Sequence, residues 1–137
     1  SSININCHGH KSCHWGKFYV DIVNPMYMDS DANGIIQCHG NESCQYVTLL
    51  FVGINDIDVY CHGNESCYGM ETTSYSNQSH LDLYCLYGKN VCRIGVINGI
   101  SSGSINIVCG KNIYTQNSCL GLQIYCPINE INEINEI

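Results

Sequence analysis

Positive charge is scarce in this chain. Its 137 residues include five Lys and Arg against twelve Asp and Glu, which gives a formal net charge of −7. Because nucleic acid and anionic membrane surfaces attract clustered positive side chains, we expect neither as a partner. No apolar run approaches the roughly 20 residues needed to cross a bilayer, so we expect no membrane insertion. No segment has the composition of a signal peptide, so we expect a mature chain or a portion of a longer one.

Catalytic motifs are also missing. The sequence contains no nucleophile elbow, no phosphate-binding loop and no metalloprotease helix. Asp58 and Asp82 occupy the same outward position in neighbouring repeats, and paired carboxylates catalyse polysaccharide hydrolysis in some β-helix enzymes. Their column continues as Asn4, Asn106 and Gln123, which indicates an exposed polar stripe. We therefore expect no enzyme, and a polysaccharide-active enzyme is only the third hypothesis.

Cysteine, by contrast, is abundant and periodic. The eleven cysteines make up about 8% of the chain, close to the composition of disulfide scaffolds. CHGNESC occurs twice unchanged, at 38–44 and 61–67, and related segments span 7–13, 85–92 and 109–119. Cys126 is expected to start a sixth copy that stays incomplete. Repetition at a period of 23 to 24 residues indicates a repeat architecture.

Each copy has the pattern of a strand with one buried face. The positions two and four before the first cysteine are almost all aliphatic, with Gly34 as the exception: Ile3 and Ile5, Ile36, Ile57 and Val59, Leu81 and Leu83, Ile105 and Ile107, and Leu122 and Ile124. A polar bend, a second apolar segment and a return turn follow. The sequence predicts an all-β fold, a parallel β-solenoid of about five to six coils over residues 1–126. The first coil is longer, which predicts a loop insertion at about 24–34, and 127–137 forms an extended, low-complexity INE-repeat tail.

This pattern resembles the disulfide-stapled right-handed parallel β-helices, the pectin-lyase-like solenoid group in its broadest sense. The resemblance covers the periodicity of nearly the whole chain and implies the fold alone, because no catalytic motif of that group is present.

Two disulfide patterns fit the spacing. Pairing within each coil is favoured because it gives the same topology five times: Cys7–Cys13, Cys38–Cys44, Cys61–Cys67, Cys85–Cys92 and Cys109–Cys119. A ladder between equivalent cysteines of neighbouring coils also satisfies disulfide geometry, and sequence alone does not decide connectivity. Cys126 is left unpaired or forms an intermolecular bond. Either pattern implies an oxidising compartment, so we expect a secreted or cell-surface protein.

Asn-X-Ser sequons predict N-linked glycans at Asn41, Asn64 and Asn77. Asp29, Asp31 and Asn33 match the front half of a calcium loop, although an acidic surface turn explains them as well. No other cofactor is expected. The repeated His8, His39 and His62 are more simply an outward ladder than zinc ligands, because zinc requires convergent ligands.

Outward tyrosines and open coil ends supply the functional hypotheses. Tyr60 and Tyr84 should form an aromatic ladder and, with Tyr125, a face for binding glycans. No capping element precedes the first coil, and the tail carries Ile at every third residue, a period that suits a polyproline-II-like segment. The first hypothesis is a glycosylated structural subunit that stacks head-to-tail into an extracellular filament or coat. The alternative is a carbohydrate-binding or adhesion module that uses the tyrosine face.

Overall fold

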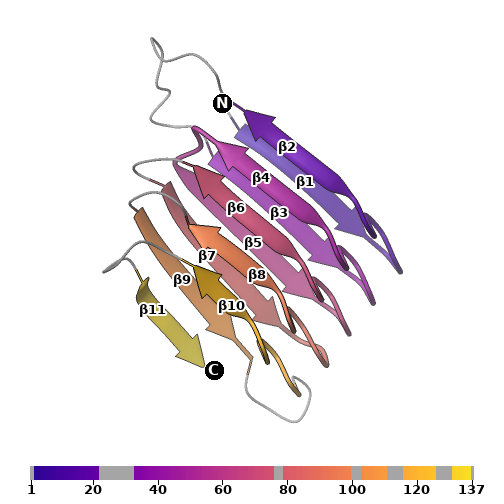
Figure 1. Cartoon of the computed structure of the whole chain (residues 1–137). Helices are drawn as coiled ribbons and strands as arrows, with labels where there is room; N and C mark the ends of the chain where they lie inside the picture. Colours follow the sequence, from indigo (N-terminus) through magenta and orange to yellow (C-terminus); the bar gives the residue numbers. More distant parts are fainter. Residues whose placement is uncertain are drawn as a thin grey trace.

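The chain forms two parallel β-sheets that face each other. The computed structural model describes residues 2–21, 33–75, 79–99, 103–110, 116–125 and 131–136. These residues contain eleven strands (Figure 1). The described part of the chain has no helix long and apolar enough to cross a bilayer.

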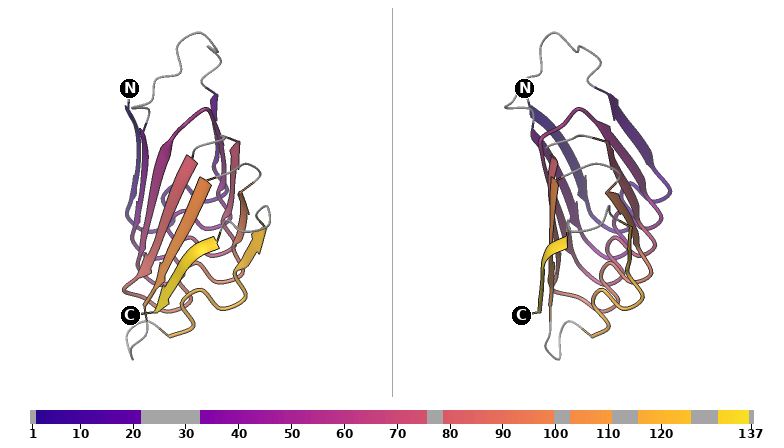
Figure 2. Two further views of the ribbon diagram at one scale, coloured as in Figure 1. Left: turned by 90° about the vertical axis from the view of Figure 1, so that its left-hand side faces the viewer. Right: turned by 60° about the vertical axis from the view of Figure 1, so that its left-hand side comes forward.

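Sheet A contains six strands in the order β1 (Ser2–His8), β3 (Asn33–His39), β5 (Asp56–His62), β7 (Ser79–Leu86), β9 (Gly103–Cys109) and β11 (Ile131–Glu136). Sheet B contains five, in the order β2 (Lys17–Asp21), β4 (Thr48–Val52), β6 (Glu71–Tyr75), β8 (Val96–Gly99) and β10 (Gln123–Tyr125). The chain alternates between the sheets, and every neighbouring pair is parallel. Figures 1 and 2 show the result, a flattened coil, so the predicted parallel β-solenoid is confirmed.

The core is a set of columns that run along the solenoid. The register places Ile36, Val59, Leu83 and Ile107 in one inward column of sheet A, and all four are buried. The first cysteines of the repeats form the next inward column. Alternation of side chains along a strand therefore gives a dry interior and a polar outer face, as the sequence pattern predicts.

Gly34 interrupts an inward column without leaving a void. A Cβ atom at Gly34 would lie 3.7 Å from the ring of Phe51 on the opposite sheet, and Phe51 is fully buried. The large ring therefore fills the space that the missing side chain leaves, which preserves close packing between the sheets.

The segment that leads from the sheet A strand to the sheet B strand of each coil and contains both cysteines, here called the cysteine turn, has an unusual backbone. In the first turn Lys11, Cys13 and Trp15 have φ of 56°, 55° and 59°. Ser12, His14 and Gly16 donate N–H bonds to the carbonyls three residues earlier, as in successive type II turns. The φ values imply strain, because such turns normally place Gly or Asn at the left-handed position.

Hydrogen bonds between coils hold this conformation. The Lys11 N–H donates to Asn41 O at 3.0 Å, and the Glu42 N–H donates to Asn64 O at 2.7 Å. The Cys44 N–H donates back to Ser12 O at 2.9 Å. The ladder of backbone bonds thus continues around the corner from sheet A to sheet B, and its many bonds offset the strain at each turn residue.

The last coil differs from the expected sixth copy. Gln123–Tyr125, which precedes Cys126, is β10 of sheet B and pairs with Val96–Asn98. The sixth strand of sheet A is β11, from the tail, which pairs with β9 rather than forming a polyproline-II segment. A register shift between Ile131 and Glu133 places Ile131 opposite Ile105 and Ile134 opposite Ile107. Ile131 and Ile134 are three residues apart, whereas their partners Ile105 and Ile107 are two residues apart. The bulge at this register shift takes up the extra residue, so both isoleucines of the tail pair with isoleucines of β9.

Candidate functional site

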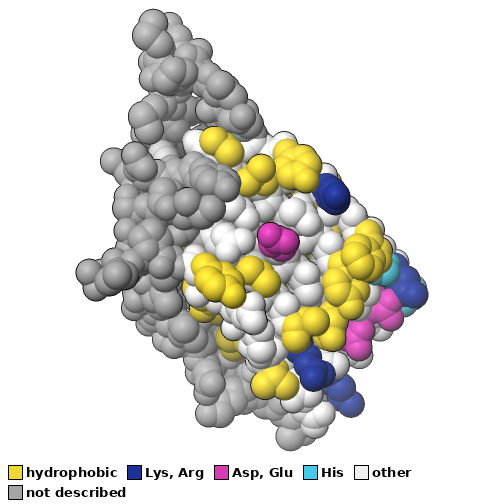
Figure 3. Space-filling view, viewed as in Figure 1, with side chains coloured by type: hydrophobic (Ala, Val, Ile, Leu, Met, Phe, Trp, Pro, Cys, Tyr) yellow, Lys and Arg dark blue, Asp and Glu magenta, His cyan; other side chains and the backbone are white. Residues whose placement is uncertain are grey.

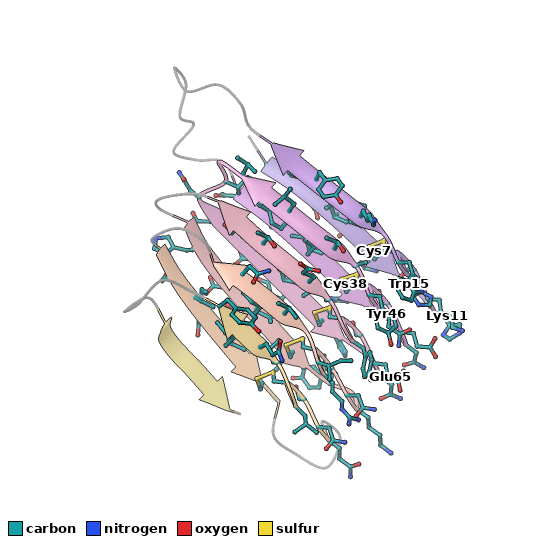
Figure 4. The ribbon with its side chains drawn as sticks, viewed as in Figure 1. Cys7, Lys11, Trp15, Cys38, Tyr46 and Glu65 are labelled. Atoms are coloured by element: carbon teal, nitrogen blue, oxygen red, sulfur yellow. A yellow bond between two sulfur atoms is a disulfide. The ribbon has the colours of Figure 1, made fainter. Side chains whose placement is uncertain are left out.

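The disulfides form a buried column inside the cysteine turns. The structure has the within-coil pairing: Cys7–Cys13, Cys38–Cys44, Cys61–Cys67, Cys85–Cys92 and Cys109–Cys119. The sulfur atoms of Cys61, Cys67 and Cys92 all lie within 4.8 Å of one another, so bridges of adjacent coils are in close proximity. Figure 4 shows the bridges of Cys7 and Cys38 side by side. Five disulfides indicate folding in an oxidising, extracellular-type environment. Cys126 lies outside the described residues.

In three of the five turns, a serine before the second cysteine ties the turn to the preceding coil. The Ser43 hydroxyl donates to Cys7 O at 2.8 Å, and the Ser66 hydroxyl donates to Cys38 O at 2.9 Å. Both residues are fully buried. From the sequence, Ser43 and Ser66 were interpreted only as the third residue of a sequon. Each directly precedes a core cysteine, and this position was the signal that could have predicted their structural role.

The two sequon asparagines of the cysteine turns each bond to the next coil. The Asn41 side-chain oxygen accepts the N–H of Asn64 at 3.2 Å, and the Asn64 oxygen accepts the N–H of Lys89 at 2.9 Å. Both bonds lie at the exposed surface. Only the amide oxygen is used in these contacts, and a glycan attaches to the amide nitrogen. The turn is therefore compatible with a sugar at either position. Asn77 lies outside the described residues.

The calcium hypothesis falls largely outside the described chain. Asp29 and Asp31 are among the residues that the structure does not describe. Asn33 is the first residue of β3, is exposed, and lies in register between Ser2 and Asp56.

Asp58 and Asp82 meet on the outer face of sheet A. They lie in register on β5 and β7. The pKa of Asp58 is raised by partial burial, then by a hydrogen bond with Asp82 and by the negative charges of Asp82 and Asp56. Carboxylates of glycosidases stand about 5 to 9.5 Å apart, whereas a hydrogen-bonded pair is closer. Below the raised pKa of Asp58, the two carboxyl groups can share one proton.

Tyr60 and Tyr84 stack beside this pair, as predicted. Their ring centres are 4.9 Å apart and the planes differ by 6°. Burial and the neighbouring aspartates raise the pKa of Tyr60, and burial and Asp82 raise the pKa of Tyr84. Because the rings cover each other's faces, this ladder mainly offers edges to a ligand. Tyr125 is on β10, so its predicted equivalence with the two other tyrosines is wrong.

His8, His39 and His62 form the predicted outward ladder, here called the histidine column. Ring centres are 5.0 Å apart between His8 and His39 and 5.3 Å apart between His39 and His62. Tyr87 extends the column at 4.9 Å from His62. The pKa of His39 is lowered by burial and then by the charges of His62 and His8.

Sequence reasoning missed a second aromatic column, formed by Trp15, Tyr46 and Tyr68 where the cysteine turns meet sheet B. The rings of Trp15 and Tyr46 stack at 4.4 Å and 18° (Figure 4). Tyr68 meets Tyr46 edge-on at 5.7 Å. Trp15 remains 66% exposed, which leaves part of its indole open to a ligand. Figure 3 shows hydrophobic side chains along this edge with charged ones beside them. Trp15 and Tyr46 each stand two residues after the second cysteine of their repeat, so aligning the repeats on that cysteine would have paired them.

An apolar pocket of about 370 Å³ opens at the last coil, lined by residues that include Ile107, Cys119, Leu122 and Ile124.

Comparison with models of protein families, with curated proteins and with solved structures finds no match to this chain. Among the described residues, the groups that could contact a ligand or partner are the stacked aromatic and histidine rings, the paired carboxyl groups of Asp58 and Asp82, and the backbone groups of the edge strands.

Proposed function

We propose that the chain is a glycosylated, extracellular structural subunit that assembles end to end into a filament or coat. The observation that carries this proposal is the constant register of the coils. The same cysteine and histidine positions align from β1 to β3 and from β3 to β5. A coil at the end of such a stack offers a neighbouring subunit the same backbone ladder that it uses internally.

Both ends present strand edges that suit this assembly. Within the described ranges, β1 and β2 have a paired strand on one side only, as do β10 and β11. An edge strand carries unpaired N–H and C=O groups that pair readily with another chain. Contact between unlike ends does not close on itself and therefore generates a filament.

A proline on β1 tests the assembly. Gly9 donates its N–H to His39 O, and alternate residues of a parallel strand bond to opposite sides. The N–H of the exposed Asn4 therefore points away from β3, and Asn4→Pro removes an edge donor while leaving internal pairing intact. Asn4→Ala is the matched control.

Negative-stain electron microscopy and light scattering give the result. Filaments of the wild type and of Asn4→Ala, together with single solenoids of Asn4→Pro, would support the proposal. A wild-type protein that stays monodisperse at high concentration would overturn it. Glycosidase treatment of protein from a secreting eukaryotic host, followed by peptide mapping of Asn41, Asn64 and Asn77, tests the sugars separately.

The second candidate is a glycan-binding or adhesion module. The observation that favours it is the exposed indole of Trp15 on top of Tyr46, because aromatic faces stack on sugar rings. Binding on a glycan array that is lost in Trp15→Ala but kept in Tyr60→Ala would place the site at Trp15. Polysaccharide hydrolysis is the third hypothesis, and it requires an activity that disappears in both Asp58→Asn and Asp82→Asn.

A further inference from the structure

The histidine column brings imidazoles from three successive strands to one outward edge of sheet A. His8, His39 and His62 are aligned by the strand register. His39 is half-buried between the other two, which are exposed. The three rings contact one another, and His62 also contacts the ring of Tyr87. The exposed rings of His8 and His62 are accessible to a ligand from solvent.

The strand register places His39 and His62 side by side on neighbouring strands. Two imidazole nitrogens that bind one ion at about 2.1 Å stand no more than about 4 Å apart. His39 and His62 have ring centres 5.3 Å apart and planes inclined by 56°, so a shared ion requires side-chain rotation to bring one nitrogen of each ring to a common point. The rings of His8 and His39, inclined by 19°, are more nearly parallel and need a larger rotation.

Only the neutral imidazole offers a lone pair to a metal ion, so binding at this column should weaken in acid.

We propose that the histidine column binds one divalent transition-metal ion through His39 and His62, with water in the remaining positions. Imidazole ligands suit copper, nickel and zinc, and Cu²⁺ is the tightest of the three by the general order of divalent metals. This inference is independent of end-to-end assembly, because the column lies on the outer face of sheet A.

Titration of the full chain with CuCl₂ tests the site. Isothermal calorimetry at pH 7.5 measures affinity, and electron paramagnetic resonance of the bound Cu²⁺ detects nitrogen ligands. Loss of even an outer-shell partner typically weakens metal sites about 10- to 100-fold, so His39→Gln should lower Cu²⁺ affinity at least about tenfold. His80→Gln is the matched control. His80 lies near the start of β7 in sheet A, but its ring bonds to the Ser104 hydroxyl.

The outcomes are separable. Tight binding by the wild type and by His80→Gln, weak binding by His39→Gln, and a loss of affinity at pH 5.5 would support the site. Absence of binding by the wild type, equal affinity of the wild type and His39→Gln, or equal losses in both variants would overturn it. Circular dichroism of each variant checks that the fold is retained.

Discussion

Replacing Gly63 by alanine should destabilise the solenoid through the close approach of neighbouring cysteine turns. A Cβ atom at Gly63 would lie 2.5 Å from Gly40 O, and the residue has φ of +126°. Gly9 occupies the same turn position in the first coil with φ of +104°, yet a Cβ atom there would meet no described heavy atom within 4 Å. The pair therefore separates backbone strain from the contact between coils.

The expected magnitudes follow from these two effects. A side chain in this region of φ costs about 1–3 kcal/mol at either position. Displacing a packed coil to accept the extra methyl costs about 1–3 kcal/mol more, at Gly63 alone. We expect Gly63→Ala to lose about 2–6 kcal/mol and Gly9→Ala about 1–3 kcal/mol. A stability of about 5–15 kcal/mol for a typical domain makes the larger loss easy to detect.

Urea unfolding with the disulfides intact, followed by circular dichroism, measures both changes. With a urea dependence of about 1–3 kcal/mol per molar, the two alanine variants should differ in midpoint by about 1 M. Equal midpoints would refute the argument, because the contact with Gly40 would then contribute nothing.

Three further changes test individual contacts. Ser66→Ala should lose about 1–3 kcal/mol in urea unfolding, since the Cys38 carbonyl loses a buried donor. Ser12→Ala removes an exposed bond to Gly9 O and a part-buried bond with the Ser43 hydroxyl, so it should lose less; equal losses would contradict this role. The folded-state pKa of Asp58 is raised above its ordinary value of 3.8, so the native state binds more protons than the unfolded state and its stability falls as the pH rises from 3.8 through the raised pKa. Asp58→Asn should abolish this fall when unfolding is measured as a function of pH, and an unchanged pH dependence would count against a proton shared with Asp82. The pKa of His39 is lower in the folded state than its ordinary value of 6.5, so His39 contributes its full stability above pH 6.5 and loses it as the pH falls below 6.5. His39→Gln should make the stability less dependent on pH in this acidic range, and an equally steep dependence would exclude His39 as its source.

The sequence was sufficient for the side-chain columns that are in register with the first cysteine of coils with matching spacing. Equivalent positions of a repeat align in a parallel sheet, so the pairing of Asp58 with Asp82, the stack of Tyr60 on Tyr84 and the histidine column all followed from spacing alone. The cysteine pairs were favoured for a related reason, because a short, recurring separation gives every coil the same closed turn.

The tertiary structure decided the turns and the last coil. Fourteen described residues other than glycine take positive φ, which no local preference predicts, because bonds to neighbouring coils and the disulfide impose that conformation. In the last coil, the choice of 123–125 for sheet B and 131–136 for sheet A depended on which strand edges remained unpaired. The local sequence determines which face of a strand is buried. The strand that it pairs with is determined by which neighbouring coil offers an unpaired strand edge.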